Sequence, residues 1–535
     1  MSDSSDKIQI ETFGSEEKVE NYIRTDKKWW QVPHLLKLNI AVALITFASS
    51  TNGYDGSMLN GLQSLPVWKI KMGLIHPDTG ELTHNSNTKL TQLANGTIYG
   101  SLLAVPFAPY VCDRYGRIFT TVLGQGITVV GSIIQGCAPN YAAFLIARMI
   151  LGLGTGFSVV SCPSLISEIA FPTHRSSATG FYNTCWYLGA LIAAWTTYGT
   201  QYLHGDNAWK VPSFIQGVLP LIQIVFIWMI PESPRYFISR GKHDKARDML
   251  RKHHTGNSDD PQDIALVEFE MKEIEAALEM EKLSTQTSYK DFINKKNFRK
   301  RLFLIMYVPC IMQLSGNGLV SYFLNKVLDS IGITDANKQL QINGCLMVYN
   351  MVISMAAAST FQFFKRRTLF LTSISCMLVC YILWTILSGL AEARNYPPAL
   401  SNGVLAFIFL YYASYDIGVN GLPILYVTEI LPYTHRAKGM NIFNFTQTCT
   451  LIFNGYVNPI GLSNVHPTYK YYIVWCCHLV VELTIVYFFF PETSGYTLEE
   501  VAKVFGDDIK EVSFIQRSDS KTKEQFVENV ESASV

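Results

Sequence analysis

Long stretches with almost no charge constrain this chain more than any other feature. Between Leu90 and Trp209 the charged side chains are only Asp113, Arg114, Arg117, Arg148, Glu168, Arg175 and Asp206. The apolar windows between them reach the ~20 residues that a helix needs to cross a bilayer. Windows of this length indicate helices, because the strands of a membrane barrel are only ~10 residues long and alternate in polarity. The sequence therefore predicts an all-α integral membrane protein.

The overall balance of charge and chemistry excludes other classes. The 535 residues include 43 Lys+Arg and 42 Asp+Glu, a net charge of +1, so the basic surface of a nucleic-acid-binding protein is absent. Charged residues make up 16% of the chain, against roughly 25% in soluble proteins. The eleven Cys lie in or beside apolar stretches without a CxxC pair, which argues against a disulfide framework or a zinc site. No nucleophile motif or phosphate loop is present in the sequence. We therefore expect neither an enzyme nor a bound cofactor or metal.

Twelve apolar windows predict twelve transmembrane helices, six on each side of a polar centre. The first six lie near 36–59, 90–112, 118–138, 141–165, 178–201 and 212–230. The second six lie near 302–326, 340–363, 368–390, 401–427, 438–460 and 470–490. The windows divide the chain into an N-terminal tail (1–34), a first six-helix half (35–230), a central loop (231–300), a second six-helix half (301–490) and a C-terminal tail (491–535).

The central loop and the two tails are expected on the cytoplasmic side of the membrane. The loop carries a basic stretch from Arg235 to Lys252, and loops rich in Lys and Arg stay in the cytoplasm. An even number of helices then places both tails on that side. Because residues 1–34 are polar, we expect no cleavable signal peptide there. Further along the loop, an amphipathic helix packed on the membrane domain is predicted from Val267, Met271, Ile274 and Leu278.

Two motifs occur twice at nearly the same offset. Glu168 and Arg175 follow the fourth window of the first half, and Glu429 and Arg436 follow the fourth window of the second, 261 residues later. The short stretches Pro231-Glu232-Ser233 and Pro491-Glu492-Thr493 repeat at an offset of 260 residues. Parallel repeats of this kind are typical of transporters built from two similar halves. The sequence thus predicts two parallel six-helix halves with the substrate site between them at mid-membrane.

Several short motifs in a fixed order resemble those of the sugar porters of the major facilitator superfamily, from about Leu35 to Glu500. They are Gly53-Tyr54-Asp55-Gly56, Asp113-Arg114-Tyr115-Gly116-Arg117, Arg148 with Gly152-Leu153-Gly154, Pro231-Glu232-Ser233-Pro234-Arg235, Gln313-Leu314-Ser315-Gly316, Glu429 with Arg436, and Pro491-Glu492-Thr493. The stretches 315–322 and Tyr182-Asn183-Thr184 look most like the fungal lactose and cellobiose permeases. The resemblance implies the major facilitator fold, with twelve helices in two parallel-repeat halves.

Ionisable residues inside a span are candidates for function. They cost roughly 2.5–3.5 kcal/mol on insertion scales, so by default they are functional or paired. Asp55 in the first span and Arg148 in the fourth are such residues. The resemblance implies that Asp55 takes up a coupling proton and faces Arg148, and a purely structural ion pair is the alternative. The resemblance supplies no role for Asp416, which is either a second proton site or a partner of Tyr415 or Asn420.

The resemblance also implies a network of ion pairs at the cytoplasmic ends of the helices, which holds the outward-facing state. Its members are Asp113, Arg114, Arg117, Glu168, Arg175, Glu232 and Arg235 in the first half, and Glu429, Arg436 and Glu492 in the second. The second half departs from the family pattern at Gln362, where the family has an Asp. The missing acid leaves open a slow or altered cycle, or a protein that senses without transporting.

A sugar site needs neutral amides for the hydroxyls and aromatic surfaces for the apolar face of the ring. By motif position the candidates are Asn183, Gln313, Asn317, Asn350 and Gln447. Hexose carriers usually have Gln, Gln, Asn and Trp at the positions of Asn183, Met312, Gly318 and Ile424. The smaller side chains here favour a disaccharide or an unusual sugar. An interhelical hydrogen bond is the alternative for any single intramembrane Asn.

Together these features predict a sugar transporter that works by alternating access in the plasma membrane, as a proton-coupled symporter of a disaccharide or related sugar. Its expected partners are the sugar, the proton and the lipid bilayer, without nucleic acid, and it is expected to be monomeric. Two alternatives remain, a transporter-like sugar receptor with little flux and a facilitative uniporter. The presence of both Asp55 and Arg148 favours the symporter.

Overall fold

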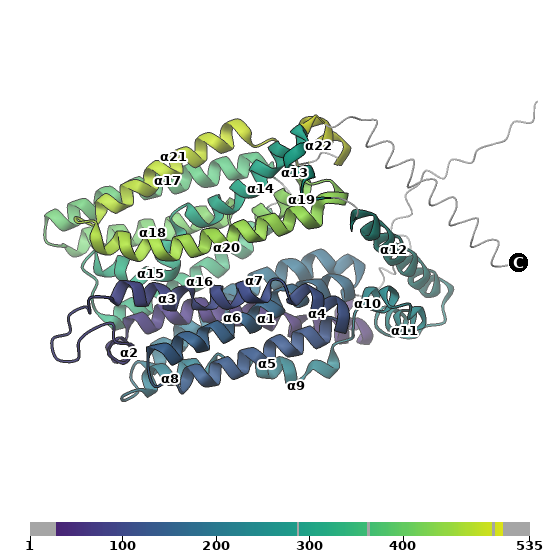
Figure 1. Cartoon of the computed structure of the whole chain (residues 1–535), viewed down its shortest axis with the longest axis horizontal. Coiled ribbons are helices and arrows are strands. Elements are labelled where there is room, and N and C mark those ends of the chain that lie inside the picture. The colour runs from purple at the N-terminus through teal and green to yellow at the C-terminus, as the bar shows by residue number, and fades with distance from the viewer. Residues whose placement is uncertain (1–27, 286–287, 361–363, 495–497, 507–535) are drawn as a thin grey trace, which may run out of the picture.

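The computed structural model describes residues 28–285, 288–360, 364–494 and 498–506. These residues fold into helices, and the β contact among them is an isolated bridge between Ile75 and Leu82. Figure 1 shows two layers of long helices stacked on each other. The first half of the chain, in purple and blue, forms one layer, and the second half, in teal to yellow, forms the other.

The described helices account for the predicted spans. In the first half they are α1 (Pro33–Ser64), α3 (Ser86–Ala104) followed by α4 (Ala108–Tyr115), α5 (Arg117–Gly136), α6 (Tyr141–Ile169), α7 (Arg175–Thr200), and α8 (Asn207–Ile215) followed by α9 (Val218–Val225). In the second half they are α14 (Lys296–Leu314) followed by α15 (Asn317–Asp329), α16 (Ala336–Thr360), α17 (Arg366–Ala393), α18 (Pro398–Gly418) followed by α19 (Leu422–Ile430), α20 (Tyr433–Asn464) and α21 (Tyr469–Phe489). The short α2 (Pro66–Lys71) connects α1 to α3. The arrangement is the predicted one of two six-span halves.

Nine helical segments of the described chain are long and apolar enough to cross a membrane. The predicted spans outside this set are α3, α7 and α20, which are less apolar. Each of them lies against the other half, because α7 packs on α16 and α3 packs on α20. The hydroxyl groups of Tyr99 on α3 and Tyr456 on α20, for example, are hydrogen-bonded at 2.7 Å. The three less apolar helices therefore lie at the interface between the halves.

Four spans are interrupted along their length. The chain breaks between α3 and α4 at residues 105–107, between α8 and α9 at Gln216-Gly217, between α14 and α15 at Ser315-Gly316, and between α18 and α19 at residues 419–421. Gly316 has a φ of 97°, which residues with a side chain rarely adopt. A backbone carbonyl freed at this break accepts a bond from a buried tyrosine, since the Tyr411 hydroxyl donates to Ser315 O at 2.9 Å. Irregular backbone at membrane depth is tolerated when it is satisfied in this way, and transport sites often lie beside it.

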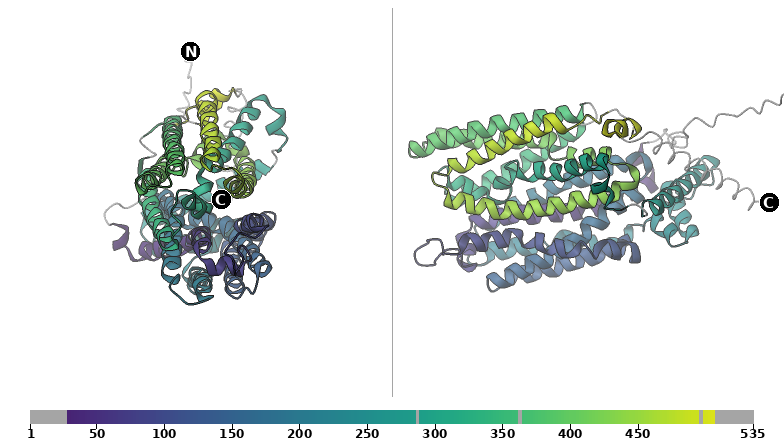
Figure 2. Two further views of the ribbon diagram at one scale, coloured as in Figure 1. Left: turned by 90° about the vertical axis from the view of Figure 1, so that its left-hand side faces the viewer. Right: turned by 45° about the horizontal axis from the view of Figure 1, so that its top comes forward.

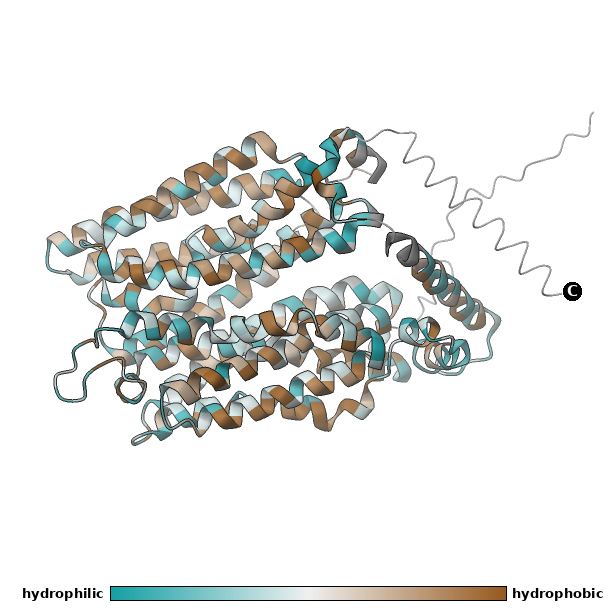
Figure 3. Cartoon of the chain, in the orientation of Figure 1, coloured by the Kyte–Doolittle hydropathy of each residue, from teal (hydrophilic) through white to brown (hydrophobic). Residues whose placement is uncertain are grey.

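The central segment and the last described helix cover one end of the bundle, at the right in Figure 1. They are α10 (Pro234–Ser239), α11 (His243–His254), α12 (Pro261–Thr285), α13 (Asp291–Asn294) and α22 (Leu498–Phe505). The right-hand view of Figure 2 shows the same arrangement from another side. We call this the central-segment end, and the other end of the bundle the opposite end. Figure 3 shows apolar residues along the long helices and polar residues toward both ends, as expected for a membrane protein.

The predicted amphipathic helix is α12. Val267 and Met271 are buried in a core cluster with residues of α11 and of the first half. His254 anchors this packing, because its Nδ1 lies 2.7 Å from Glu270 and its Nε2 lies 3.2 Å from the carbonyl oxygen of Ile169. Burial disfavours the charged imidazole, but the Glu270 carboxylate outweighs burial and raises the pKa of His254 above 6.5. The buried pair thus fixes the central segment to the end of α6.

Candidate functional site

Asp55 of α1 and Arg148 of α6 face each other inside the first half. Arg148 Nη1 and Nη2 each donate to one carboxylate oxygen of Asp55 at 3.2 Å, the two-pronged geometry that suits a guanidinium and a carboxylate. Arg148 Nε also donates to the carbonyl oxygen of Leu93 at 2.6 Å. Arg148 is 1% exposed and Asp55 is 7% exposed. The structure therefore brings the two residues together where an unpaired charge would be very costly.

Gln216 joins this pair, although no motif in the sequence predicts it. It lies at the break between α8 and α9, and its Nε2 donates to Asp55 Oδ1 at 2.9 Å. A signal for it exists in the sequence, since Gly217 follows it inside an apolar window and Gly-interrupted windows point to transport sites. Asp55 of α1 thus accepts hydrogen bonds from side chains on two other spans. Protonation of this carboxyl group would remove the charge that holds the three side chains together.

Three of the predicted amide residues are buried in the second half. Gln313 and Asn317 flank the break between α14 and α15, and Asn350 lies on α16. Asn317 Nδ2 donates to the Tyr415 hydroxyl at 3.1 Å, whereas its Oδ1 and the Oδ1 of Asn350 have no partner among the described residues. Buried acceptors without a partner are rare, so these two oxygens single out Asn317 and Asn350 among the predicted amides.

The other two predicted amides have different surroundings. Asn183 is exposed on α7 and Gln447 is half-buried on α20. Both helices belong to the interface between the halves. The grouping of all five amides into one sugar site stays a prediction.

The room expected at Gly318 is taken by another side chain. A Cβ atom at residue 318 would lie 2.1 Å from Asn454 Nδ2. This amide is held by a hydrogen bond to the carbonyl oxygen of Gln313 at 2.6 Å. Asn454 of α20 therefore places an amide beside residue 318 from a neighbouring helix. The smaller residue at 318 does not by itself enlarge the site.

Acidic residues at the central-segment end hold the start of α5. Glu232 accepts hydrogen bonds from the backbone N–H groups of Arg117 and Ile118, at 3.1 Å each, and so caps the helix N-terminus. Arg117 Nη2 in turn donates to Glu168 of α6 at 3.1 Å. Asp113 lies 3.8 Å from the Arg117 guanidinium, one helical turn earlier in the chain. Four of the predicted gating residues therefore form one cluster within the first half.

The second half repeats this cluster at the start of α17. Glu492 accepts hydrogen bonds from the backbone N–H groups of Arg366 and Arg367, at 2.8 and 3.2 Å. Arg366 also pairs with Glu429 of α19, with 3.2 Å between Nε and Oε1. Arg366 was not among the predicted residues, although it follows Gln362 by the same spacing as Arg117 follows Asp113. The pair of Arg117 with Glu168 and that of Arg366 with Glu429 each lie within one half.

Arg175 and Arg114 make other contacts than the clusters. Arg175 lies 4.0 Å from Glu273 of α12, so it reaches the central segment. The carbonyl oxygen of Arg114 accepts a hydrogen bond from Arg240 at 2.9 Å. These contacts connect the membrane spans to α10–α12.

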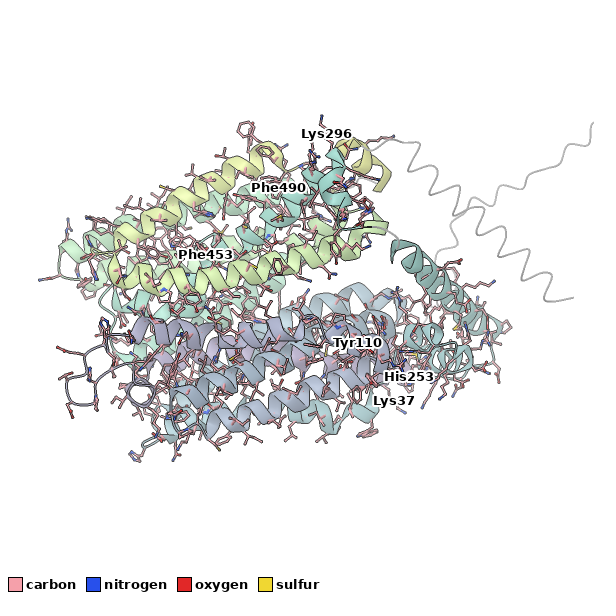
Figure 4. All side chains as sticks on the ribbon, viewed as in Figure 1. Lys37, Tyr110, His253, Lys296, Phe453 and Phe490 are labelled. Atoms are coloured by element: carbon pink, nitrogen blue, oxygen red, sulfur yellow. The ribbon has the colours of Figure 1, made fainter. Side chains whose placement is uncertain are left out.

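The remaining residues of the predicted gating network are Arg235 and Arg436, together with Gln362 at the position of the missing acid. Arg235 and Arg436 are each engaged in a contact, whereas Gln362 lies outside the described residues. Figure 4 places Lys37, His253 and Lys296 toward the central-segment end as well. Basic and titratable groups therefore extend beyond the two clusters.

Amide side chains join the two halves at the opposite end. Asn60 Nδ2 of α1 donates to the carbonyl oxygen of Ser321, and Asn325 Nδ2 of α15 donates to the carbonyl oxygen of Asn60, both at 2.6 Å. Gln63 Nε2 donates to the carbonyl oxygen of Tyr322 at 2.9 Å. Asn60 and Ser321 are 261 residues apart, which is the offset of the repeated Glu–Arg motif. We therefore place this contact near the axis that relates the halves.

Asp416 lies near the end of α18 and is 1% exposed. Its Oδ1 accepts hydrogen bonds from the Tyr187 hydroxyl of α7 at 2.8 Å and from Asn420 Nδ2 at 2.9 Å. Asn420 was one of its two predicted partners. The other, Tyr415, instead donates to the carbonyl oxygen of Met312 at 2.9 Å. Because Tyr187 belongs to the first half, this acid connects the two halves.

The sequence matches a known transporter family. The sugar (and other) transporter family matches residues 41–505. The chain belongs to this family, the sugar porters of the major facilitator superfamily. It is an integral membrane transporter and not an enzyme.

Individual relatives of the transporter agree with this assignment. The chain is 27% identical over 474 residues to the MFS-type transporter oryC of Aspergillus oryzae, and the alignment covers 86% of this chain and 85% of that protein. It is also 27% identical over 486 residues to hexose transporter 2 of Kluyveromyces lactis, covering 89% and 83%. The closer resemblance to fungal lactose and cellobiose permeases stays a prediction.

Solved structures support the fold of the transporter. The inward open conformation of the xylose transporter XylE from E. coli matches with a TM-score of 0.71 at 18% identity, over 87% of this chain and 99% of that one. The structure of the proton:xylose symporter XylE bound to 6-bromo-6-deoxy-D-glucose matches with a TM-score of 0.68 at 19% identity, over 88% and 99%. At this level of identity the match establishes the two-half fold.

Proposed function

We propose that this sugar porter couples sugar uptake to protons and that Asp55 carries the proton. The single observation behind the proposal is the buried, two-pronged ion pair of Asp55 with Arg148. As a carboxylate, Asp55 is held by Arg148 and Gln216. As a neutral acid it loses most of that attraction, so the two protonation states favour different arrangements of α1, α6 and α8. A match to a solved structure titled a proton:xylose symporter supports the same reading.

We infer that the structure is inward-facing, with the central-segment end in the cytoplasm. Basic residues of the central loop favour that side of the membrane. The amides of Asn60 and Asn325 bridge the halves at the opposite end, while at the central-segment end Arg117 pairs with Glu168 and Arg366 with Glu429, each within one half. Both termini are then cytoplasmic, and we propose a monomer in the plasma membrane. Alternating access would break the bridges at one end and join the clusters at the other.

The substrate we propose is a disaccharide or related sugar. The name of one relative, hexose transporter 2, supports a sugar as the general class. The proposal of a disaccharide rests on the residues that differ from those of hexose carriers. Of these residues, Gly318 supports it least, because Asn454 fills the space beside it. Counterflow of a labelled sugar against lactose, cellobiose, glucose and xylose tests the choice. A carrier that exchanges only the two monosaccharides would overturn the disaccharide and leave the transport function intact.

The Asp55→Asn variant tests the coupling. It keeps the size of the side chain and one acceptor oxygen but removes the group that titrates. We expect it to lose sugar accumulation against a gradient, while exchange of labelled for unlabelled sugar continues. Uptake into proteoliposomes with and without an imposed pH gradient measures both activities.

Outcomes of this experiment also separate the alternatives. Glu482→Gln is the matched control, because Glu482 is a fully buried acid whose neighbour is His478 on the same helix, 3.1 Å away. It should remain coupled. Wild-type uptake that ignores the pH gradient would overturn the proposal in favour of a uniporter, and sugar binding without flux would favour a receptor.

A further inference from the structure

Asp416 is a second buried acid. Unlike Asp55, which pairs with Arg148, it is hydrogen-bonded to neutral groups. It lies on α18 just before the break to α19, about half-way along this span. Its Oδ1 accepts the hydrogen bonds from Tyr187 and Asn420. Its Oδ2 is buried and has no hydrogen-bond partner among the described residues. A charged oxygen in this position is very costly, whereas a carboxyl group that carries a proton has no charge to compensate.

The groups that face Asp416 are neutral. Its hydrogen-bond partners are the Tyr187 hydroxyl from α7 and the Asn420 amide. The tyrosines that lie near enough to interact with it electrostatically are Tyr349 from α16 and Tyr412 and Tyr415 from α18. The α17 helix also packs on α18 but brings no charged group to this acid. No Lys, Arg or His in the described part of the chain forms an ion pair with it. Ionisable residues inside a membrane that lack an opposite charge take the neutral form or serve in transport.

We propose that Asp416 binds a second proton in the transport cycle, on Oδ2. This inference rests on the proposed proton coupling through Asp55. Oδ2 is the oxygen that takes the proton, because it is buried and accepts no hydrogen bond from the described residues. On this proposal, the arrangement with Asp55 paired to Arg148 is the one in which Asp416 holds its proton.

Tyr187 links the proton on Asp416 to the movement of the halves. Tyr187 lies on the first half and Asp416 on the second, so separation of α7 from α18 breaks their hydrogen bond. Water then reaches the carboxyl group from the open side. The O–H bond of Asp416 breaks by giving its proton to water, or forms by taking one from hydronium, and no other covalent bond changes. The two states of the transporter thus differ in their affinity for this proton, which is the requirement for coupling.

Infrared difference spectroscopy on the purified, sugar-free protein tests the protonation directly. We expect a band of a protonated carboxyl group at neutral pH that Asp416→Asn removes and Asp55→Asn keeps. Tyr187→Phe removes a hydrogen-bond donor without adding charge, and we expect it to keep the band and shift its frequency. The proposal is wrong if no carboxyl band responds to Asp416→Asn, or if the band ignores the loss of the Tyr187 hydroxyl.

The number of protons moved with each sugar tests the coupling itself. In proteoliposomes we expect the proton-to-sugar ratio of Asp416→Asn to be lower by about one than that of the wild type. Glu482→Gln is again the control and should keep the wild-type ratio. An unchanged ratio in Asp416→Asn together with a lost infrared band would mean a permanently protonated acid and would overturn the second site alone. A wild-type protein that moves no protons would instead overturn the proposed role of Asp55, and the second site with it.

Discussion

Asp55 and Asp416 show how surroundings give the same side chain different chemistry. Asp55 accepts hydrogen bonds from the guanidinium of Arg148 and from Gln216. Asp416 accepts them only from neutral groups, the Tyr187 hydroxyl among them, and keeps one oxygen unpaired. The sequence identifies both residues as intramembrane acids. It does not distinguish them, because the deciding partners come from other helices that are distant along the chain.

Asn350 offers the sharpest test of the sugar site at this scale. Its side chain is 1% exposed and its Oδ1 has no partner among the described residues. A sugar hydroxyl that donates to this oxygen would lose its partner in Asn350→Ala, at a cost of about 1–3 kcal/mol. We therefore expect the sugar concentration for half-maximal uptake to rise about five-fold or more.

The control for Asn350→Ala is Cys345→Ala, because Cys345 is an exposed residue on the same helix. This variant should keep the wild-type half-maximal concentration. Surface labelling would show that both variants reach the membrane. Wild-type affinity in a correctly inserted Asn350→Ala protein would remove residue 350 from the site.

At the scale of elements, glycines let α1 and α7 approach each other closely. A Cβ atom at Gly53 of α1 would lie 1.8 Å from the carbonyl oxygen of Trp186, and one at Gly189 of α7 would lie 1.7 Å from the carbonyl oxygen of Ser50. Small residues are enriched between membrane helices because they allow this approach. Since α1 also carries Asp55, the contact helps to position the proposed proton site.

Gly189→Ala tests this contact between helices. The added methyl group meets backbone, which cannot move aside as a flexible side chain can, so we expect a loss of stability of about 1–3 kcal/mol. Thermal unfolding of the purified protein measures the change. Gly199 on the same helix has no atom within 4 Å of a Cβ position, and Gly199→Ala should be neutral or stabilising by up to about 1 kcal/mol. Equal melting temperatures for the two variants would contradict the close approach.

The apolar windows predicted the spans but not their interruptions. The windows near 90–112, 212–230, 302–326 and 401–427 predict continuous helices. The structure breaks them at residues 105–107, at Gln216-Gly217, at Ser315-Gly316 and at residues 419–421. Hydropathy is averaged over about 20 residues, so a break of two or three residues leaves little trace in it. The breaks matter because Gln216 and Asn420 occupy them and bind Asp55 and Asp416.

The whole molecule shows the repeat as two equivalent clusters. Arg117 with Glu168 in the first half corresponds to Arg366 with Glu429 in the second. The sequence contains this correspondence in its repeated motifs, and that part of the architecture was predictable. The contacts between the halves were not predictable. Asn60, for example, bonds to Ser321, which is 261 residues away, and no local sequence pattern indicates which side chains meet over such a separation.

The amides at the opposite end should set how long the transporter stays closed there. Asn325→Ala removes the donor to the carbonyl oxygen of Asn60, and the net loss of about 0.5–1.5 kcal/mol corresponds to a shift of about two- to ten-fold in the population of the closed state. We expect backbone amides at that end of α1 and α15 to exchange hydrogen for deuterium faster by a similar factor. Ser330→Ala is the control, because the Ser330 hydroxyl contacts only Val327 and Tyr472 of its own half. If both variants exchange at the wild-type rate, or both exchange equally fast, the bond between Asn325 and Asn60 does not hold the two halves together.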